Sequence, residues 1–230
     1  MIHGNVSGAA AGDNAPVGHG AKEMNVFSFV FLMGCQLAAG LNVVVPAYPA
    51  NAAHGGNVAA VIEFSKGAAS RVVILYADEP FVEPTRTALA QWRVSAERKD
   101  KPALVVVNFR EPFLSVVNTG HGIKLEPQSH RIDSSRYDRS MPVPKLVVDP
   151  FYSDASLVVM GASVLHLEVT ESGSVGEVEV IQALGDYTQA TVEAVKKWSF
   201  VPARNETDRP VASDAFGICV YRPLQNLREP

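Results

Sequence analysis

The sequence predicts an α+β protein built from two tandem copies of one small module, in which a helix lies on one face of a three-stranded antiparallel sheet. Three observations support this fold. The two tryptophans, Trp92 and Trp198, stand in matching surroundings 106 positions apart. The residues before each tryptophan have the spacing of one helix face, and two short runs of alternating apolar residues precede each helix. A repeat of this length limits the choice of fold more than any single residue does.

Each copy begins with an approach segment and a β-hairpin. Apolar residues 43–45 precede the first hairpin, and residues 146–148 precede the second. Two alternating apolar runs follow, joined by a turn that contains Gly67 or Gly173, as expected for antiparallel strands with one buried face. The matched apolar positions are Ala60, Ile62, Phe64, Val72 and Ile74 in the first copy and Leu165, Leu167, Val169, Val178 and Val180 in the second.

A helix and a last strand complete each copy. The helix faces match at the spacing i, i+3, i+4, i+7, through Thr85, Ala88, Leu89 and Trp92 in the first copy and Thr191, Ala194, Val195 and Trp198 in the second. Pro84 suits the first turn of one helix, and Asp186 with Gln189 resembles a capping box at the start of the other. We expect both tryptophans to anchor a helix on its sheet, and we expect the last strands at residues 104–109 and 215–221.

These elements divide the chain into an N-terminal segment at residues 1–41, a first module at 42–112, a linker at 113–145 and a second module at 146–230. The linker has few apolar periodicities and several glycines and prolines, so we expect loop. Each module is short for an independent core, and we therefore expect the two modules to pack against each other.

Within the N-terminal segment, residues 26–41 are strongly apolar, and three interpretations stay open. Apolar side chains alternate from position 27 to 33, as in a buried strand. Residues 32–35 resemble a lipoprotein cleavage box, as in an export or lipid signal. A spanning helix is the third interpretation, although the stretch is shorter than the roughly 20 residues that a bilayer requires. The preceding residues, 1–23, have a composition typical of disorder.

The second copy resembles the C-terminal domain of TonB, the energy-transducing protein of Gram-negative envelopes. The resemblance rests mainly on a Trp-x-Phe-x-Pro-Ala run behind a helix, at residues 198–203, and the first copy adds a Pro-Ala-Tyr-Pro run at residues 46–49. The signature residues are Tyr48, Pro49, Trp92, Trp198, Phe200 and Pro202. The first copy lacks the Phe and Pro after its tryptophan, and the chain lacks the long proline-rich spacer of TonB.

The resemblance implies a binding module of the periplasm or cell envelope that is not an enzyme. In that family the last strand receives a peptide of an outer-membrane receptor, so the resemblance implies strand addition by a protein or peptide partner, one that could be an outer-membrane receptor of energy-coupled transport. The resemblance does not by itself imply that this chain transduces energy. The implied edge is Ala215, Phe216, Gly217, Ile218, Cys219, Val220 and Tyr221, with residues 104–109 as its counterpart. The alternative is a structural scaffold of the envelope, in which these edges pair with each other or with the N-terminal strand and bind nothing.

Composition and motifs favour no other class of function. The net charge is −4 and no basic patch suggests nucleic acid. Neither a P-loop nor a dinucleotide fingerprint occurs, and the two cysteines, Cys35 and Cys219, make no zinc pattern; we expect Cys219 to be a buried free thiol. We expect no cofactor, no metal and no small-molecule substrate, and membrane association only through the N-terminal segment.

The histidines and carboxylates that are candidates for chemistry each have a plain interpretation. We expect His54, His121, His130 and His166 in loops or on an exposed sheet face, and Glu177 and Glu179 on a solvated face of a strand. The rival is a hydrolase whose site is assembled across the two copies. A histidine–carboxylate pair in a deep pocket would favour that rival.

Overall fold

The computed structural model describes residues 40–95, 101–110, 115–118, 123–126, 129–132, 139–151 and 160–222. Almost all of the apolar stretch at 26–41 lies outside these residues, as do residues 1–23 and His121, so the interpretations given for them stay predictions. Leu41 packs against the core of the first half. In the described part of the chain, no helix combines the length and apolar character that crossing a membrane requires.

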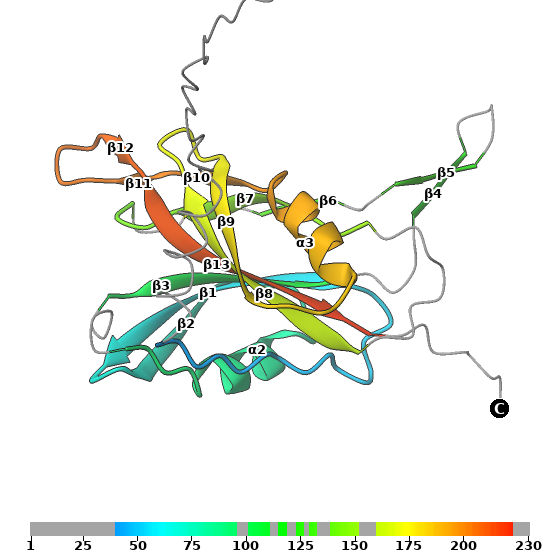
Figure 1. The fold of residues 1–230 in the computed structure, drawn as a ribbon, viewed down its shortest axis with the longest axis horizontal. Helices are drawn as coiled ribbons and strands as arrows, with labels where there is room; N and C mark the ends of the chain where they lie inside the picture. Colours follow the sequence, from blue (N-terminus) through cyan, green and yellow to red (C-terminus); the bar gives the residue numbers. More distant parts are fainter. Residues whose placement is uncertain are drawn as a thin grey trace, which may run out of the picture.

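One six-stranded sheet runs through both halves of the chain, in the order β2-β1-β3-β13-β8-β9 (Figure 1). Its strands are β1 (Gly56–Ser65), β2 (Ala68–Ala77), β3 (Ala103–Phe109), β8 (Gly161–Val169), β9 (Val175–Gln182) and β13 (Ser213–Tyr221). Neighbours are antiparallel except β3 and β13, which are parallel. The predicted α+β class is therefore confirmed, but the two expected three-stranded sheets are joined into one.

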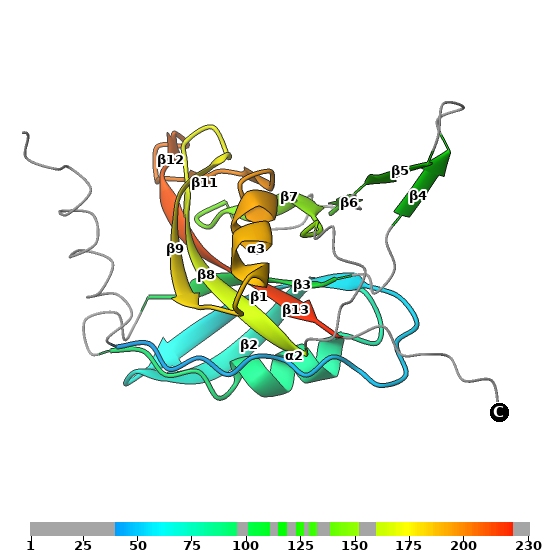
Figure 2. The same cartoon turned by 45° about the vertical axis from the view of Figure 1, so that its right-hand side comes forward.

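Two helices lie on opposite faces of this sheet, α2 (Val82–Leu89) and α3 (Tyr187–Val195) (Figure 2). Each helix covers its own hydrophobic core, one centred on Leu89 and Trp92 and the other on Val195 and Trp198. Because both faces are covered, β3 is buried along its whole length, and its sequence is a nearly continuous apolar run rather than an alternating one.

Both helices end before their tryptophans. The last helical residues are Leu89 and Val195, and a tight turn then brings Trp92 and Trp198 back into the cores, where they are 0% and 2% exposed. The tryptophans are core anchors as predicted, but the helices do not extend to them. The predicted capping box is also wrong, because Asp186 makes no side-chain capping hydrogen bond.

A layer of short strands lies on the α3 side. Strand β7 (Val143–Val148) pairs with β6 (Ser129–Arg131) and with β10 (Ser199–Val201). Two small hairpins are formed by β4 (Ser115–Asn118) with β5 (Ile123–Glu126) and by β11 (Ala203–Arg204) with β12 (Pro210–Val211). The segment 113–145 is therefore not only loop. The strands that lie wholly within it, β4, β5 and β6, have three or four residues, too few to give a periodic signal in the sequence.

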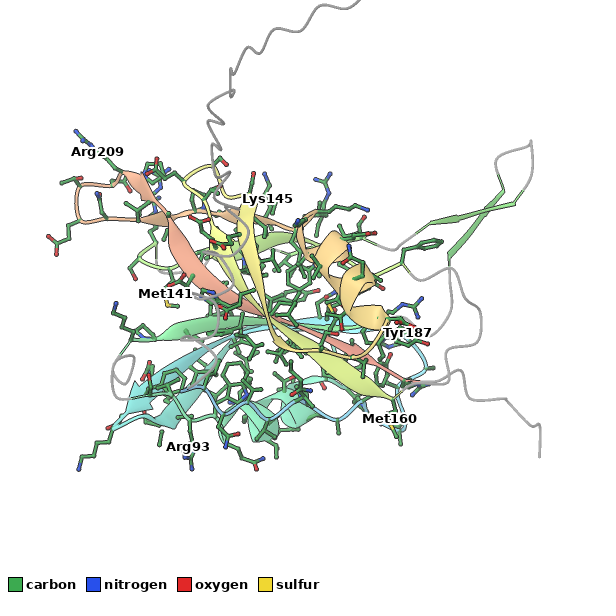
Figure 3. The ribbon with its side chains drawn as sticks, viewed as in Figure 1. Arg93, Met141, Lys145, Met160, Tyr187 and Arg209 are labelled. Atoms are coloured by element: carbon green, nitrogen blue, oxygen red, sulfur yellow. The ribbon has the colours of Figure 1, made fainter. Side chains whose placement is uncertain are left out.

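Several contacts recur in the two halves at matching positions. Trp92 Nε1 donates to Val44 O at 2.9 Å, and Trp198 Nε1 donates to Val148 O at 2.9 Å. Each hairpin turn contains a glycine with positive φ, 79° in the first half and 81° in the second, whose carbonyl accepts a hydrogen bond from the segment after the helix. In Figure 3, Arg93, which follows Trp92, is labelled on the α2 side. Lys145 of β7, the strand that contains Val148, is labelled on the α3 side.

Candidate functional site

Residues 215–221, the predicted partner-binding edge, form an inner strand. Strand β13 is paired with β3 on one side and with β8 on the other, and these seven residues are buried. The expectation of a free edge at Ala215, Phe216, Gly217, Ile218, Cys219, Val220 and Tyr221 is therefore wrong, and the same holds for residues 104–109. The physical reason is that the last strand of each half satisfies the unpaired backbone groups of the other.

The signature residues build packing rather than a surface. Tyr48 lies edge-on to Phe81 and Phe109, with ring centroids 5.6 Å away in both cases. Its hydroxyl donates to His54 O at 2.8 Å. The guanidinium of Arg222 lies 4.7 Å from the centre of the Tyr48 ring and also donates to Pro49 O at 3.2 Å. In the second half, Phe200 is buried and Pro202 lies beside the turn glycine Gly173.

The outer edges of the sheet are β2 and β9, and the β2 edge is partly closed. At its start, Ala69 N donates to Trp92 O at 3.1 Å. Further along, Arg86 of α2 donates from Nη1 to Val72 O at 3.2 Å, and its Nε lies 3.5 Å from a carboxylate oxygen of Glu83. An arginine side chain laid across a strand edge occupies a backbone acceptor that a further strand would need.

The β9 edge is more open. Its start is covered by a bridge between Ser174 and Ser199, but within the described residues no strand pairs with the outer side of β9 itself. Helix α2 packs against β2 and β1, whereas α3 packs mainly against β8 and β7. Val180 of β9 is 42% exposed, an unusual value for a large apolar side chain in this sheet.

His166 lies in a cross-strand cluster rather than on an exposed face. Its Nε2 is 3.2 Å from Asp214 Oδ1, its Nδ1 is 3.8 Å from Glu179 Oε2, and its side chain is 13% exposed. The prediction that His166 and Glu179 are solvated is wrong, because β8 lies between β9 and β13 and both neighbours place a carboxylate beside the imidazole. His54 is exposed as predicted. Among the described residues, no group of three histidine, cysteine or carboxylate side chains is arranged to hold a metal ion.

A second polar group is buried at the centre of the sheet. Asn57, Asn108, Cys219 and Ser163 are directly paired across β1, β3, β13 and β8 and are all 0% exposed. Asn108 Nδ2 donates to Asn57 Oδ1 at 2.9 Å and to Asp149 Oδ1 at 2.8 Å.

His130 adds a histidine–carboxylate pair to this group, since its Nε2 lies 3.2 Å from Asp149 Oδ1. It is half-buried, so the prediction that it is solvated is wrong. The Cys219 thiol is free and buried, as predicted. Burial raises its pKa well above the ordinary value, which keeps the thiol protonated and unreactive. A groove lies on the face of β1 and β2 that α2 does not cover, and Val73 and Leu75 line it. It contains neither histidine–carboxylate pair.

The sequence analysis did not identify β2 and β9 as the accessible edges of the sheet. The repeat nevertheless contains a difference that distinguishes these two edges. At matching positions of the two helices, Arg86 stands in the first half and Val192 in the second. Only the first half therefore has, at this position, a long side chain that can donate to the strand edge and cap it.

Residues 157–217 match the family model of the Gram-negative bacterial TonB protein C-terminal domain. The matched residues include β8, β9, α3 and the first part of β13, which belong to the second half of the chain. That family consists of non-enzymatic protein-interaction domains associated with the envelope and with transport. Neither a curated protein nor a solved structure matches the chain at a significant level.

Proposed function

We propose that this chain is a non-enzymatic interaction protein of a Gram-negative cell envelope, composed of two tandem modules of the TonB C-terminal type that share one sheet. Its function is to bind a partner protein or peptide by strand addition. The observation that carries the proposal is the family match at residues 157–217, which include a hairpin, a helix and a last strand in the order that the resemblance implies.

The contacts that recur in the two halves support the assignment of a second module to residues 42–112. The indole of each tryptophan donates to the carbonyl of an approach segment, and each turn glycine accepts from the segment after the helix. Independent folds would not be expected to share these contacts at nearly constant spacing along the chain.

Strand addition at an outer edge is the binding mode that fits this sheet. A peptide that adds as a further strand gains backbone hydrogen bonds, and its alternate side chains contact the two faces. Because β3 and β13 are hydrogen bonded to each other inside the sheet, the partner must use the outer edge at β2 or at β9. Outer-membrane receptors of energy-coupled transport are the partners that the family suggests, and the periplasm is the compartment.

The test uses the full chain and synthetic peptides from the plug regions of outer-membrane receptors. Binding is measured by calorimetry, and amide hydrogen exchange locates it. Strand addition is expected to slow the exchange of amides along β2 or β9, because new ladder hydrogen bonds protect them. Binding that leaves both edges unprotected would exclude this mode.

The second candidate function is a structural scaffold of the envelope, and the pairing of β3 with β13 favours it. Both edges that the family resemblance assigns to partners are filled inside the molecule. A scaffold of this kind would bind none of the receptor peptides, and its amide exchange would stay unchanged when they are added.

A further inference from the structure

We propose that β9 is the docking edge, and that it takes an extended partner segment in which basic and apolar residues alternate. This inference rests on the proposed function, because it specifies where the added strand lies and what chemistry it has. It is carried by the difference between the two outer edges and by the side chains on the two faces of β9.

The two edges differ at one matched position of the helices. Arg86 of α2 donates to Val72 O and so closes part of β2. Its counterpart in α3 is Val192, which packs partly buried against the second core and has no group to donate. The carbonyl of Val178, the counterpart of Val72, therefore has no such cap. The β9 edge keeps an acceptor that the β2 edge has given up.

The helices reinforce this difference. Helix α2 lies against β2, whereas α3 is centred on β8 and β7 and leaves β9 at the margin of the sheet. The exposure of Val180 reflects this shift. An added strand would cover Val180 and extend the second core, which makes burial of apolar surface part of the driving force.

The α3 side of β9 therefore requires apolar residues in the partner. Val178 and Val180 project to this side, since they pair with Leu167 and Leu165 of the second core. Val192 of α3 lies on the same side. Every second residue of an added strand would face these valines.

The opposite side of β9 is acidic. Glu177 and Glu179 alternate with the valines, and cross-strand pairing places Glu168 and Asp214 on the same face. Glu168, Glu177 and Asp214 are exposed, and His166 is the imidazole among them. The intervening residues of the partner would lie beside Glu177 and Glu179 of β9, with Glu168 of β8 and Asp214 of β13 farther across the same face. Lysine or arginine at these positions of the partner therefore gives charge complementarity.

The test compares capped octapeptides on the full chain. One alternates lysine and valine, one alternates glutamate and valine, and one has the lysine–valine composition in two blocks. The alternating lysine–valine peptide is expected to bind at least about tenfold more tightly than the other two, and its affinity is expected to fall as salt is added. N-methylation of alternate peptide nitrogens should abolish binding, because it removes ladder hydrogen bonds without any change in the protein.

Matched variants locate the site. Val180→Pro removes a donor and blocks strand approach on β9, and Ile74→Pro makes the same change at the counterpart position of β2. The first variant is expected to weaken lysine–valine binding at least about tenfold, and the second to leave it within about twofold. Glu177→Lys should weaken binding of the lysine–valine peptide and strengthen binding of the glutamate–valine peptide. Circular dichroism verifies that each variant is folded. If Val180→Pro does not fold, the N-methylated peptide tests strand addition on the unchanged protein instead.

Equal affinity for the lysine and glutamate peptides overturns the proposal, and so does unchanged binding to folded Val180→Pro. Receptor peptides that protect β2 instead of β9 would leave the proposed function standing and refute this inference. Peptides that protect neither edge would refute both.

Discussion

At the scale of single residues, the least expected feature is the row of polar side chains at the centre of the sheet. Asn57, Asn108, Cys219 and Ser163 lie side by side in an otherwise apolar layer. Burial of polar groups destabilises a fold unless they are hydrogen bonded, and the amide nitrogen of Asn108 meets this condition through two acceptors. A one-residue shift of β3 against its neighbours would separate these groups, so the row favours the observed register.

Asn108→Ala should therefore destabilise the protein by about 2–3 kcal/mol, because it removes the donor that the Asn57 side-chain carbonyl accepts and one of the groups that contact the Asp149 carboxylate. Urea denaturation measures the free energy of unfolding. Ser163→Ala is the matched control from the same row. The Ser163 hydroxyl is buried without a hydrogen-bond partner among the described residues, so its removal should be neutral or slightly stabilising. Equal losses in both variants would contradict the role given to Asn108.

The Cys219 thiol makes stability depend on alkaline pH. Burial raises its pKa above the ordinary value of 9.0, and the carboxylate of Asp149 adds to this effect while Arg110 opposes it. Burial likewise raises the pKa of Tyr221 above its ordinary value of 10.0. Above these ordinary values the unfolded chain loses protons that the folded chain keeps. The contribution of these two groups to the free energy of unfolding is therefore fully present below about pH 9 and is lost as the pH rises.

Cys219→Ala should reduce this dependence by up to about 1.4 kcal/mol per pH unit above about pH 9, which is the contribution of one proton. The measurement is the free energy of unfolding in urea at several pH values from neutral to alkaline. The variant is expected to be less stable at neutral pH because it loses buried volume, so the slope is the informative quantity. Parallel slopes for the two proteins would show that the thiol is not linked to folding.

At the scale of elements, the local signals in the sequence were sufficient for the hairpins and the helices. Alternation and turn glycines located β1 with β2 and β8 with β9, and helical spacing located α2 and α3. The helical spacing predicts helices that reach Trp92 and Trp198, and this is wrong, because both side chains continue the spacing after the backbone has turned. A side chain can keep its place on a buried face after the helix itself has ended.

Pairing between distant strands was beyond reach of the local pattern. The nearly continuous apolar run of β3 is compatible with an edge strand or an inner one. The mutual pairing of the last strands was one of the alternatives that the sequence left open. The predicted exposure of His166 is wrong for the same reason, since its two carboxylate neighbours come from β9 and β13. Because the last strands pair with each other, the accessible edges of the sheet are β2 and β9.

The turn glycine of the second hairpin gives a prediction at this scale. Gly173 has φ of 81°, and a Cβ there would overlap the carbonyl oxygen of Phe200. Gly173→Ala should destabilise the protein by more than about 2 kcal/mol, because backbone strain and overlap add. Gly185, with φ of 50° and open space around a Cβ, is the control, and Gly185→Ala should lose only about 1 kcal/mol. Thermal melts that rank the two variants in the opposite order would contradict this account.

At the scale of the whole molecule, each half completes the core of the other. Phe216, Ile218 and Val220 of β13 belong to the first core, and Leu104 and Val106 of β3 belong to the second. The pairing of the two last strands inside one sheet produces this exchange, because each strand presents alternate residues to both covered faces.

This exchange predicts that the two halves unfold together. Trp92 lies edge-on to Phe216 of the other half, with ring centroids 5.4 Å apart, so loss of the second half would expose the first tryptophan. The two tryptophans are natural probes of the two halves. In Trp198→Phe the remaining fluorescence reports the first core, and in Trp92→Phe it reports the second.

Within each variant, the fluorescence midpoint in urea should coincide with the midpoint from far-UV circular dichroism, which reports the whole sheet. Comparison inside one variant matters because each substitution destabilises the protein by its own amount. A fluorescence midpoint that departs from the circular dichroism midpoint in either variant would mean that the halves unfold separately. In that case the β3–β13 pairing could open while each half stays folded, and the inner strands would again be available to a partner.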